Sequence, residues 1–279
     1  MSHKRTLGQF YTTNYKYILQ GQYVPANVPR IVEPFAGNGD LLGIIPDDHG
    51  AALELYDIDP KRDDIVRRDS LMNPPNYADS FVLTNPPYLA RNKNADKTVY
   101  DKYGTNDLYK CFMQSLLQSE PCAGGIIIVP LNFVCSIRAA DVSLRRQFMS
   151  KYGCVRINIF MCPVFDDTDY TVCSIQFDRA PRPICDIVIF PAGECFSATL
   201  GDHNNYTIGG ELYALPCRPD MRVSRATEDT VDSPHLTNIL LKCIDDSEYL
   251  GFKLVHDRDR FIDHTPNRSA RSYATLVIE

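Results

Sequence analysis

The chain has 279 residues, of which 44% are hydrophobic and 23% charged, and its formal net charge is -6. These proportions exclude a disordered chain and are typical of one large globular domain or of one medium domain with a smaller one. An acidic balance gives no general attraction for nucleic acid, although phosphate contacts need only a local basic surface.

The cysteines and the apolar runs exclude several further classes. The ten cysteines form no CxxC pair, which argues against a zinc site, so we expect reduced thiols in an intracellular protein. The amino terminus is polar and the apolar runs are short, so neither a signal peptide nor a membrane span is predicted.

The first two-thirds of the chain alternates β-rich runs with helical segments. Strands are predicted at residues 30–33, 52–57, 65–67, 81–84, 125–129, 155–160 and 171–177, and helices at 13–20, 107–118 and 140–152. Such alternation predicts an α/β fold with a parallel sheet and helices on both faces. Too few residues separate the last two strands for a helical crossover, so we expect that pair to be antiparallel.

Two prolines interrupt this pattern. Pro181 and Pro183 predict a boundary between a first domain of residues 1–180 and a second region of residues 181–279. The second region is too irregular for its fold to be predicted from the sequence.

A glycine turn follows the first predicted strand. Gly37 and Gly39 allow a sharp turn and a close approach to a ligand, at the edge where doubly wound sheets bind ligands. A dinucleotide site would have a third glycine where this chain has Leu42. Glu33, before the turn, suits a ligand with an ammonium group, such as S-adenosylmethionine. The glycines alone fit a purely structural turn equally well.

Acidic residues also end the next two predicted strands. Asp57 can accept hydrogen bonds from two ribose hydroxyls, and Asp69 can accept one from an adenine amine. Each alone is more often a strand-end cap or a solvated charge. Their order, one for each successive strand, favours a nucleoside ligand.

The tetrapeptide Asn85-Pro86-Pro87-Tyr88 directly follows the fourth predicted strand. An exocyclic amine on a nucleobase is a weak nucleophile, and two oxygen acceptors on its hydrogens would direct its lone pair toward a methyl group. Asn85 can offer a side-chain carbonyl and Pro86 a backbone carbonyl, held by the rigid Pro-Pro unit. Tyr88 can stack on the base. Positioning and dipoles would carry such a reaction, on a base swung out of the duplex.

With these motifs in this order, the chain resembles the N6-adenine DNA methyltransferases of restriction–modification systems and large DNA viruses, over about residues 6–180. The motif order is similar to that of the gamma group. The resemblance implies a class I S-adenosylmethionine-dependent methyltransferase fold, Rossmann-like, with a mostly parallel seven-stranded sheet containing one antiparallel strand. Residues 1–180 would be the catalytic domain and residues 181–279 a small target-recognition region.

The resemblance also implies the activity and the site. A methyl group would pass from S-adenosylmethionine to the N6 amine of a flipped adenine in a short site of double-stranded DNA, without a metal. A cognate restriction endonuclease would be a partner, in a bacterial cytoplasm or a virus-infected cell. Asn85, Pro86 and Tyr88 would be catalytic, and Phe165 would sandwich the base with Tyr88. The implied cofactor-binding residues are Tyr11, Thr12, Glu33, Phe35, Gly37, Gly39, Asp57, Ile58, Asp69, Ser70 and Asn85.

Two groups of cations are candidates for phosphate contact. The first follows the tetrapeptide and contains Arg91, Lys93, Lys97 and Lys102. The second lies in the carboxyl-terminal region and contains Arg218, Arg222 and Arg225. An ordinary solvated loop is the alternative interpretation of either group.

Two other functions stay open. Protein-glutamine and ribosomal-RNA methyltransferases of the same fold use this tetrapeptide on a planar amine. The glutamine enzymes usually carry an amino-terminal helical domain, and only about thirty residues precede the first strand here. A non-catalytic module that binds S-adenosylmethionine or nucleic acid is the other alternative, against which the intact Glu33, Asp57 and Asn85 argue.

Overall fold

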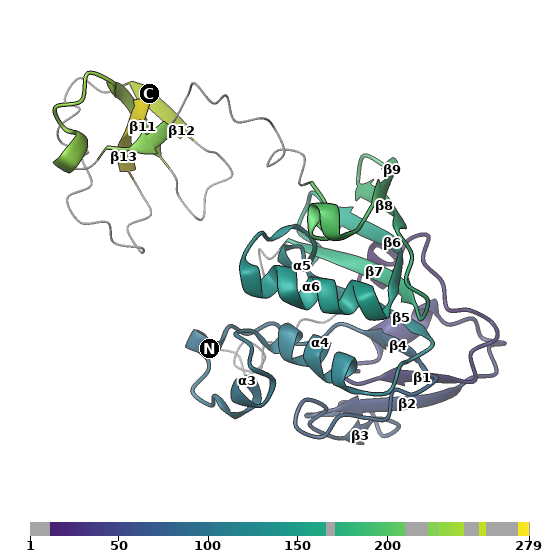
Figure 1. Ribbon diagram of the computed structural model, residues 1–279. Helices are drawn as coiled ribbons and strands as arrows, with labels where there is room; N and C mark the ends of the chain where they lie inside the picture. The colour runs from purple at the N-terminus through teal and green to yellow at the C-terminus, as the bar shows by residue number, and fades with distance from the viewer. Residues whose placement is uncertain are drawn as a thin grey trace. The chain divides into compact units, whose positions relative to one another are not determined.

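The computed structural model describes residues 12–165, 171–209, 223–226, 228–242, 251–254 and 273–278. The chain divides into two compact units, residues 1–210 and residues 211–279, each with a sheet of its own (Figure 1). In these described parts, no helix is long and apolar enough to cross a membrane.

A nine-stranded sheet in the order β3-β2-β1-β4-β5-β7-β6-β8-β9 is the frame of the first unit. Its strands are β1 (Arg30–Glu33), β2 (Ala52–Asp57), β3 (Val66–Arg67), β4 (Phe81–Thr84), β5 (Gly124–Pro130), β6 (Gly153–Phe160), β7 (Val172–Asp178), β8 (Ile184–Phe190) and β9 (Glu194–Thr199). Strands β1 to β5 pair in parallel, and β7 runs antiparallel to both β5 and β6. This confirms the predicted sheet with an antiparallel β7, whose short connection to β6 leaves no room for a crossover.

The sheet is larger than the seven strands predicted. β8 pairs in parallel with β6, and β9 completes the sheet by pairing antiparallel with β8. Pro181 and Pro183 therefore lie in the connection from β7 to β8, and the first unit extends to residue 210 instead of ending at residue 180. Prolines break a strand locally, but they do not prevent the chain from re-entering the same sheet.

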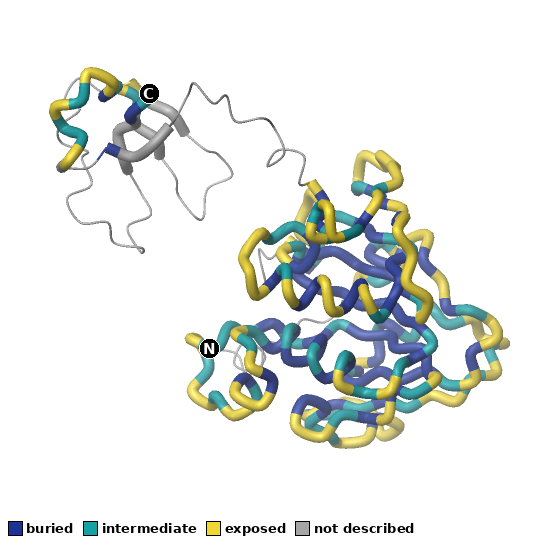
Figure 2. Tube along the Cα trace, viewed as in Figure 1, coloured by how far each residue is buried: buried dark blue, intermediate teal, exposed yellow. Residues whose placement is uncertain are grey.

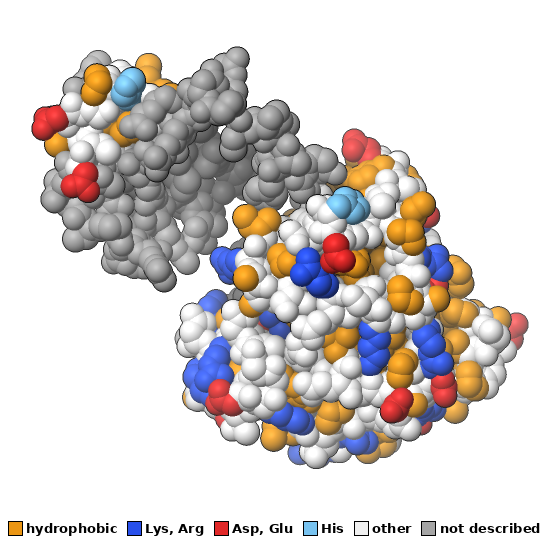
Figure 3. Space-filling model, in the orientation of Figure 1, with side chains coloured by type: hydrophobic (Ala, Val, Ile, Leu, Met, Phe, Trp, Pro, Cys, Tyr) orange, Lys and Arg blue, Asp and Glu red, His pale blue; other side chains and the backbone are white. Residues whose placement is uncertain are grey.

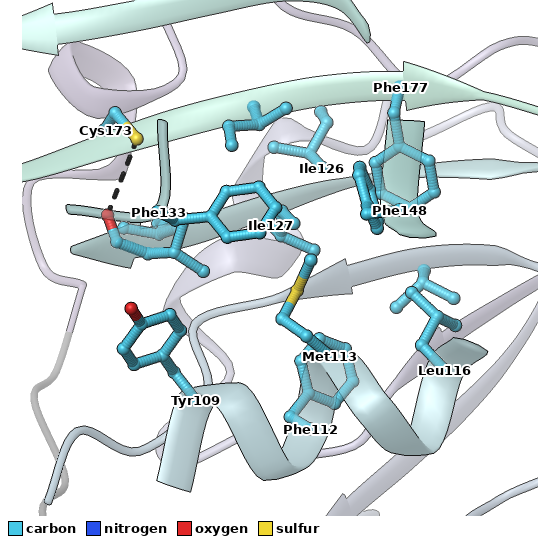
Figure 4. Packing of buried hydrophobic residues seen from close by; sticks show 14 of the residues in the cluster. Tyr109, Phe112, Met113, Leu116, Ile126, Ile127, Phe133, Phe148, Cys173 and Phe177 are labelled. Carbon is cyan, nitrogen blue, oxygen red and sulfur yellow. Dashed lines mark hydrogen bonds between the residues drawn. The ribbon is translucent and has the colours of Figure 1, made fainter. Parts of the chain in front are cut away.

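Two helices cover one face of the sheet, α4 (Leu108–Gln118) and α6 (Ala139–Lys151), with the single turn α5 (Asn132–Cys135) beside them. Figure 4 shows Met113 of α4 pointing toward Ile127 of β5, and the ring of Phe112 packs edge-on against Phe35, with centroids 5.5 Å apart. Phe148 of α6 meets Phe177 of β7 edge-on, with ring centroids 5.2 Å apart. The apolar side chains enclosed here belong to the main core. Figure 2 shows the buried segments of the chain in dark blue.

The opposite face of β6 and β7 is covered in another way. There the helix predicted at residues 13–20 is reduced to α2 (Tyr15–Ile18), followed by an irregular segment. Buried polar side chains hold this segment. Asn158 Nδ2 donates to the carbonyls of Ile18 and Gln20 at 3.1 and 3.0 Å, and Ser174 Oγ donates to Ile18 O at 2.8 Å. Side-chain hydrogen bonds from β6 and β7 thus hold this segment, which forms only one helical turn where a helix of residues 13–20 was predicted.

Shorter elements complete the first unit, namely η1 (Asp40–Ile44), η2 (Arg91–Lys93), α3 (Thr98–Tyr103) and η3 (Asp202–Asn204). The second unit contains β10 (Val223–Arg225), η4 (Glu228–Thr230), β11 (Leu236–Lys242), β12 (Gly251–Leu254) and β13 (Tyr273–Ile278). Its four strands pair antiparallel in the order β10-β13-β11-β12, around a small cluster of Ala226, Leu236 and Val277.

Candidate active site

A cavity of about 330 Å³ lies at the carboxyl ends of β1, β2 and β4. Its wall contains nine of the residues predicted to bind a cofactor, namely Thr12, Glu33, Phe35, Gly37, Asp57, Ile58, Asp69, Ser70 and Asn85. Gly39 is not part of the wall, and Tyr11 lies outside the described residues. Parallel strands end at a common edge, which brings together side chains distant in the sequence.

The glycine turn is tied to the end of β2. Gly37 and Gly39 have φ angles of 56° and 80°, in the left-handed region that glycine adopts without strain. The carboxylate of Asp57 accepts hydrogen bonds from Gly37 N and Asp59 N, both at 2.8 Å. Asp57 therefore fixes the turn. A carboxylate oxygen can accept more than one hydrogen bond, so this anchoring is compatible with acceptance from a ligand hydroxyl.

Glu33 is buried in the wall, with 1% of its surface exposed. Its Oε2 atom has no hydrogen-bond partner among the residues that the structure describes. Burial raises the pKa of Glu33 well above its usual value, and the carboxylates of Asp40 and Asp57 raise it further, against the lowering effect of Arg62. A cationic donor at this position would stabilise the ionised form of Glu33.

A second buried oxygen without a described partner lies in the same wall. Asp69 Oδ1 accepts the backbone N–H groups of Leu71 and Met72, both at 3.0 Å, which closes a tight turn around Ser70. Ser70 Oγ is buried and has no partner among the described side chains and backbone groups. An unsatisfied buried polar group costs about 1–3 kcal/mol. A polar ligand that bonded to Glu33 and Ser70 would remove this cost.

The amide of Asn85 is held at both ends. Asn85 Nδ2 donates to Thr12 Oγ1 at 3.0 Å, and Asn85 Oδ1 accepts from the hydroxyl of Tyr88. The same hydroxyl lies 2.8 Å from the carbonyl oxygen of Ile128 in β5, so two acceptors share its hydrogen. Burial raises the pKa of Tyr88 well above its usual value, which keeps this hydrogen in place.

The two aromatic residues predicted to stack on a base are not on the cavity surface. Tyr88 and Phe165 are 3% and 7% exposed, and both belong to the main core. The ring of Tyr88 packs edge-on against Tyr109, with centroids 6.3 Å apart. The local sequence does not reveal this burial, and the stacking of Tyr88 and Phe165 on a base stays a prediction. Pro87 lines the cavity, whereas Pro86 does not.

Most of the predicted phosphate-binding cations of the first group contact other groups of the protein, although Lys102 itself is exposed. Lys97 Nζ donates to the carbonyls of Arg91 and Asn94, and the Arg91 guanidinium pairs with Asp101 at 2.6 Å. Lys102 Nζ donates to two backbone carbonyls. Lys93 is exposed. Figure 3 shows Lys and Arg side chains on the surface near α3. Arg218 and Arg222 lie outside the described residues, and nothing is described of the side chain of Arg225.

Part of the wall comes from residues that the sequence analysis did not select. The segment after the tetrapeptide contributes Leu89, Asn94, Asp96 and Val99. No local pattern marks these residues, because only the fold of the segment brings them to the cavity. Asp40 is also in the wall, and its place directly after the glycine turn was a usable signal. Within the described ranges, no three His, Cys, Asp or Glu side chains gather as a metal ion would require.

No protein-family model matches the chain, and no curated protein matches its sequence. Solved structures do resemble it. A DrdV–DNA complex determined by cryo-electron microscopy has a TM-score of 0.53 at 14% identity, over 86% of this chain and 35% of that one. The type IIG restriction endonuclease BpuSI has a TM-score of 0.49 at 13% identity, over 89% and 38% of the two chains.

A methyltransferase subunit of a type I restriction–modification system from Streptococcus thermophilus has a TM-score of 0.45 at 13% identity, over 65% of this chain and 47% of that one. The chain thus spans about half the length, or less, of these proteins. The order of the first seven strands is that of the class I S-adenosylmethionine-dependent methyltransferase fold. The cavity lies at the edge of the sheet where this fold binds its ligand.

Proposed function

We propose that this protein transfers a methyl group from S-adenosylmethionine to the N6 amine of an adenine rotated out of double-stranded DNA. The observation that carries the proposal is the position of Asn85. Its amide, which belongs to the tetrapeptide, lines the cavity that also contains Glu33, Asp57 and Asp69. One wall therefore combines groups suited to the cofactor with the group suited to the reacting amine.

The residues of the cavity fit S-adenosylmethionine. Glu33, with a buried oxygen that lacks a described partner, would hold the ammonium group, and Asp57 would accept the ribose hydroxyls. Asp69 would accept the amine of the cofactor's adenine, and the orphaned Ser70 oxygen lies next to it in the chain. When bound, the cofactor supplies a methyl group that its sulfonium has already activated.

Asn85 acts on the substrate amine as a positioned acceptor. Its hydrogen bonds to Thr12 and Tyr88 select one orientation of the amide and hold it before substrate arrives. An amide oxygen has two lone pairs, so acceptance from Tyr88 is compatible with acceptance from an amine hydrogen. With the Pro86 carbonyl as second acceptor, the lone pair of the amine would turn out of the ring plane. Preorganised dipoles of this kind need no reorganisation during the reaction.

Tyr88 serves this chemistry through its hydroxyl. Its buried ring gives a base no exposed face in this conformation, whereas its hydroxyl donates to Asn85. We therefore assign Tyr88 to the positioning of the amide. We assign target recognition to the second unit, residues 211–279. The proposal also includes a cognate restriction endonuclease as a partner.

Methyl transfer to DNA tests the proposal directly. The full chain is incubated with labelled S-adenosylmethionine and DNA of mixed sequence, and the modified base is mapped. We expect N6-methyladenine, and we expect the label on DNA to be lost in Asn85→Ala. Transfer to ribosomal RNA or to a glutamine peptide, with none to DNA, would favour the alternative enzymes. Cofactor binding without transfer to any of these acceptors would identify a non-catalytic module.

A further inference from the structure

The short helix α3 is joined to a turn that is distant in the sequence. Lys102 Nζ donates to the carbonyls of Leu71 and Met72 at 3.0 and 2.7 Å. The Tyr103 hydroxyl donates to the same Leu71 carbonyl at 2.6 Å. The Lys102 ammonium also lies over the Tyr103 ring, 4.9 Å from its centroid. Two neighbouring side chains of α3 thus bind two neighbouring peptide groups.

Those peptide groups belong to the turn that contains the proposed adenine contact. The N–H groups of Leu71 and Met72 bind Asp69 Oδ1. Their carbonyls bind Lys102 and Tyr103. The Leu71–Met72 peptide unit is therefore held on both sides, through its N–H by Asp69 and through its carbonyl by Lys102 and Tyr103. This couples the orientation of Asp69 to the position of α3.

The segment that contains α3 is also part of the cavity wall. Asn94, Asp96 and Val99 line the cavity together with residues 68–71. The segment is braced internally, since the Tyr100 hydroxyl donates to Leu89 O at 2.9 Å and Lys97 binds two carbonyls of the same segment. It can therefore act as one piece, attached to the turn through the end of α3.

We propose that Lys102 and Tyr103 are positioning residues for the cofactor site. They hold the segment of residues 89–103 against the turn of residues 69–72, and thereby set the affinity and the residence time of the cofactor. Lys102 serves this clamp and does not bind a DNA phosphate. The inference rests on the proposed function only in its choice of S-adenosylmethionine as the ligand.

The test compares loss of the clamp with loss of an equal charge nearby. Lys102→Met keeps most of the stem and removes the ammonium, and Tyr103→Phe keeps the ring and removes the hydroxyl. Lys102→Arg restores donors for the two carbonyls. Lys93→Met is the matched control, because Lys93 is an exposed cation of the same segment. Binding of S-adenosylmethionine is measured by calorimetry and its dissociation by stopped flow, both without DNA, and DNA affinity by fluorescence anisotropy.

We expect Lys102→Met and Tyr103→Phe each to weaken cofactor binding about tenfold through faster dissociation, as loss of a positioning hydrogen bond does. The double variant should fall short of the product of the two effects, because both groups bind the Leu71 carbonyl. The KM for cofactor should rise with kcat retained, and Lys102→Arg should recover most of the affinity. Lys93→Met should leave cofactor dissociation at the wild-type rate.

Two results would overturn this inference alone: unchanged cofactor dissociation in both clamp variants, or a loss of DNA affinity in Lys102→Met with normal cofactor binding. Should Lys102→Met fail to fold, Tyr103→Phe and Lys102→Arg decide the question by the same readouts. A wild-type protein that bound no S-adenosylmethionine would instead overturn the proposed function, and this inference with it.

Discussion

Tyr88→Phe separates two roles of the tyrosine, because it removes one oxygen atom and keeps the ring. The hydroxyl donates to Asn85 Oδ1 and lies 2.8 Å from Ile128 O, while the ring packs against Tyr109. If the hydroxyl positions Asn85, the variant loses turnover although the ring remains. If the ring stacks on the base after a rearrangement, the variant stays active.

The expected magnitude follows from the hydrogen bonds that are lost. Loss of one buried hydrogen bond costs about 0.5–1.5 kcal/mol, and an acceptor left unsatisfied about 1–3 kcal/mol. The fold should therefore lose about 1–2 kcal/mol of stability. With the hydrogen bond from Tyr88 to the amide of Asn85 removed, we expect the rate of methyl transfer to fall about 10- to 100-fold, or about 1.4–2.8 kcal/mol of barrier.

A single-turnover assay with labelled cofactor measures this rate at saturating cofactor and DNA, and calorimetry checks that cofactor affinity is retained. Tyr109→Phe is the control for loss of a hydroxyl from a neighbouring buried tyrosine. Tyr88→Leu removes both ring and hydroxyl. A Tyr88→Phe rate within about twofold of wild type, together with an inactive Tyr88→Leu, would refute the positioning role.

Four further substitutions test other parts of the structure. Asn85→Ala should lose several orders of magnitude in turnover while its cofactor affinity, measured by calorimetry, is retained. Asp57→Ala should instead weaken cofactor binding first, because the glycine turn also loses its anchor. Asn158→Ala removes the donor of the Gln20 carbonyl and one of the two donors of the Ile18 carbonyl, so the free energy of unfolding in urea should fall by about 2 kcal/mol. An unchanged midpoint would contradict this account of the sheet face. Glu33→Gln should raise the melting temperature of the ligand-free protein at neutral pH. The folded-state pKa of Glu33 is raised, so its contribution to stability is complete below the unfolded pKa and is lost as the pH rises through the folded pKa. Glu33→Gln should also reduce the rise in melting temperature caused by S-adenosylmethionine. In the wild type we expect cofactor binding to weaken as the pH falls through the pKa of Glu33, and this pH dependence should be absent in Glu33→Gln. Equal shifts in both proteins at every pH would exclude a role for Glu33 in holding the cofactor.

Much of the sheet could be predicted because its signals are local. Each predicted strand and the helices α4 and α6 agree with the observed elements to within two residues at each end. Apolar β-rich runs, the amphipathic pattern of α4 and a connection too short for a crossover are all visible in a window of a few residues. The helix predicted at residues 13–20 is only four residues long in the structure, because polar contacts with β6 and β7 determine how that segment lies.

The sequence by itself determined that the acidic residues at the strand ends and the tetrapeptide lie at one edge of the sheet. A residue directly after a parallel strand lies at the edge where such sheets bind ligands. Tertiary structure alone decided that β8 and β9 extend the sheet, that the ring of Tyr88 is buried, and that Lys102 binds the carbonyls of residues 71 and 72. These outcomes depend on which distant groups compete for the same side chain. A lysine in a polar loop looks the same in sequence whether its ammonium contacts a phosphate or two backbone carbonyls thirty residues away.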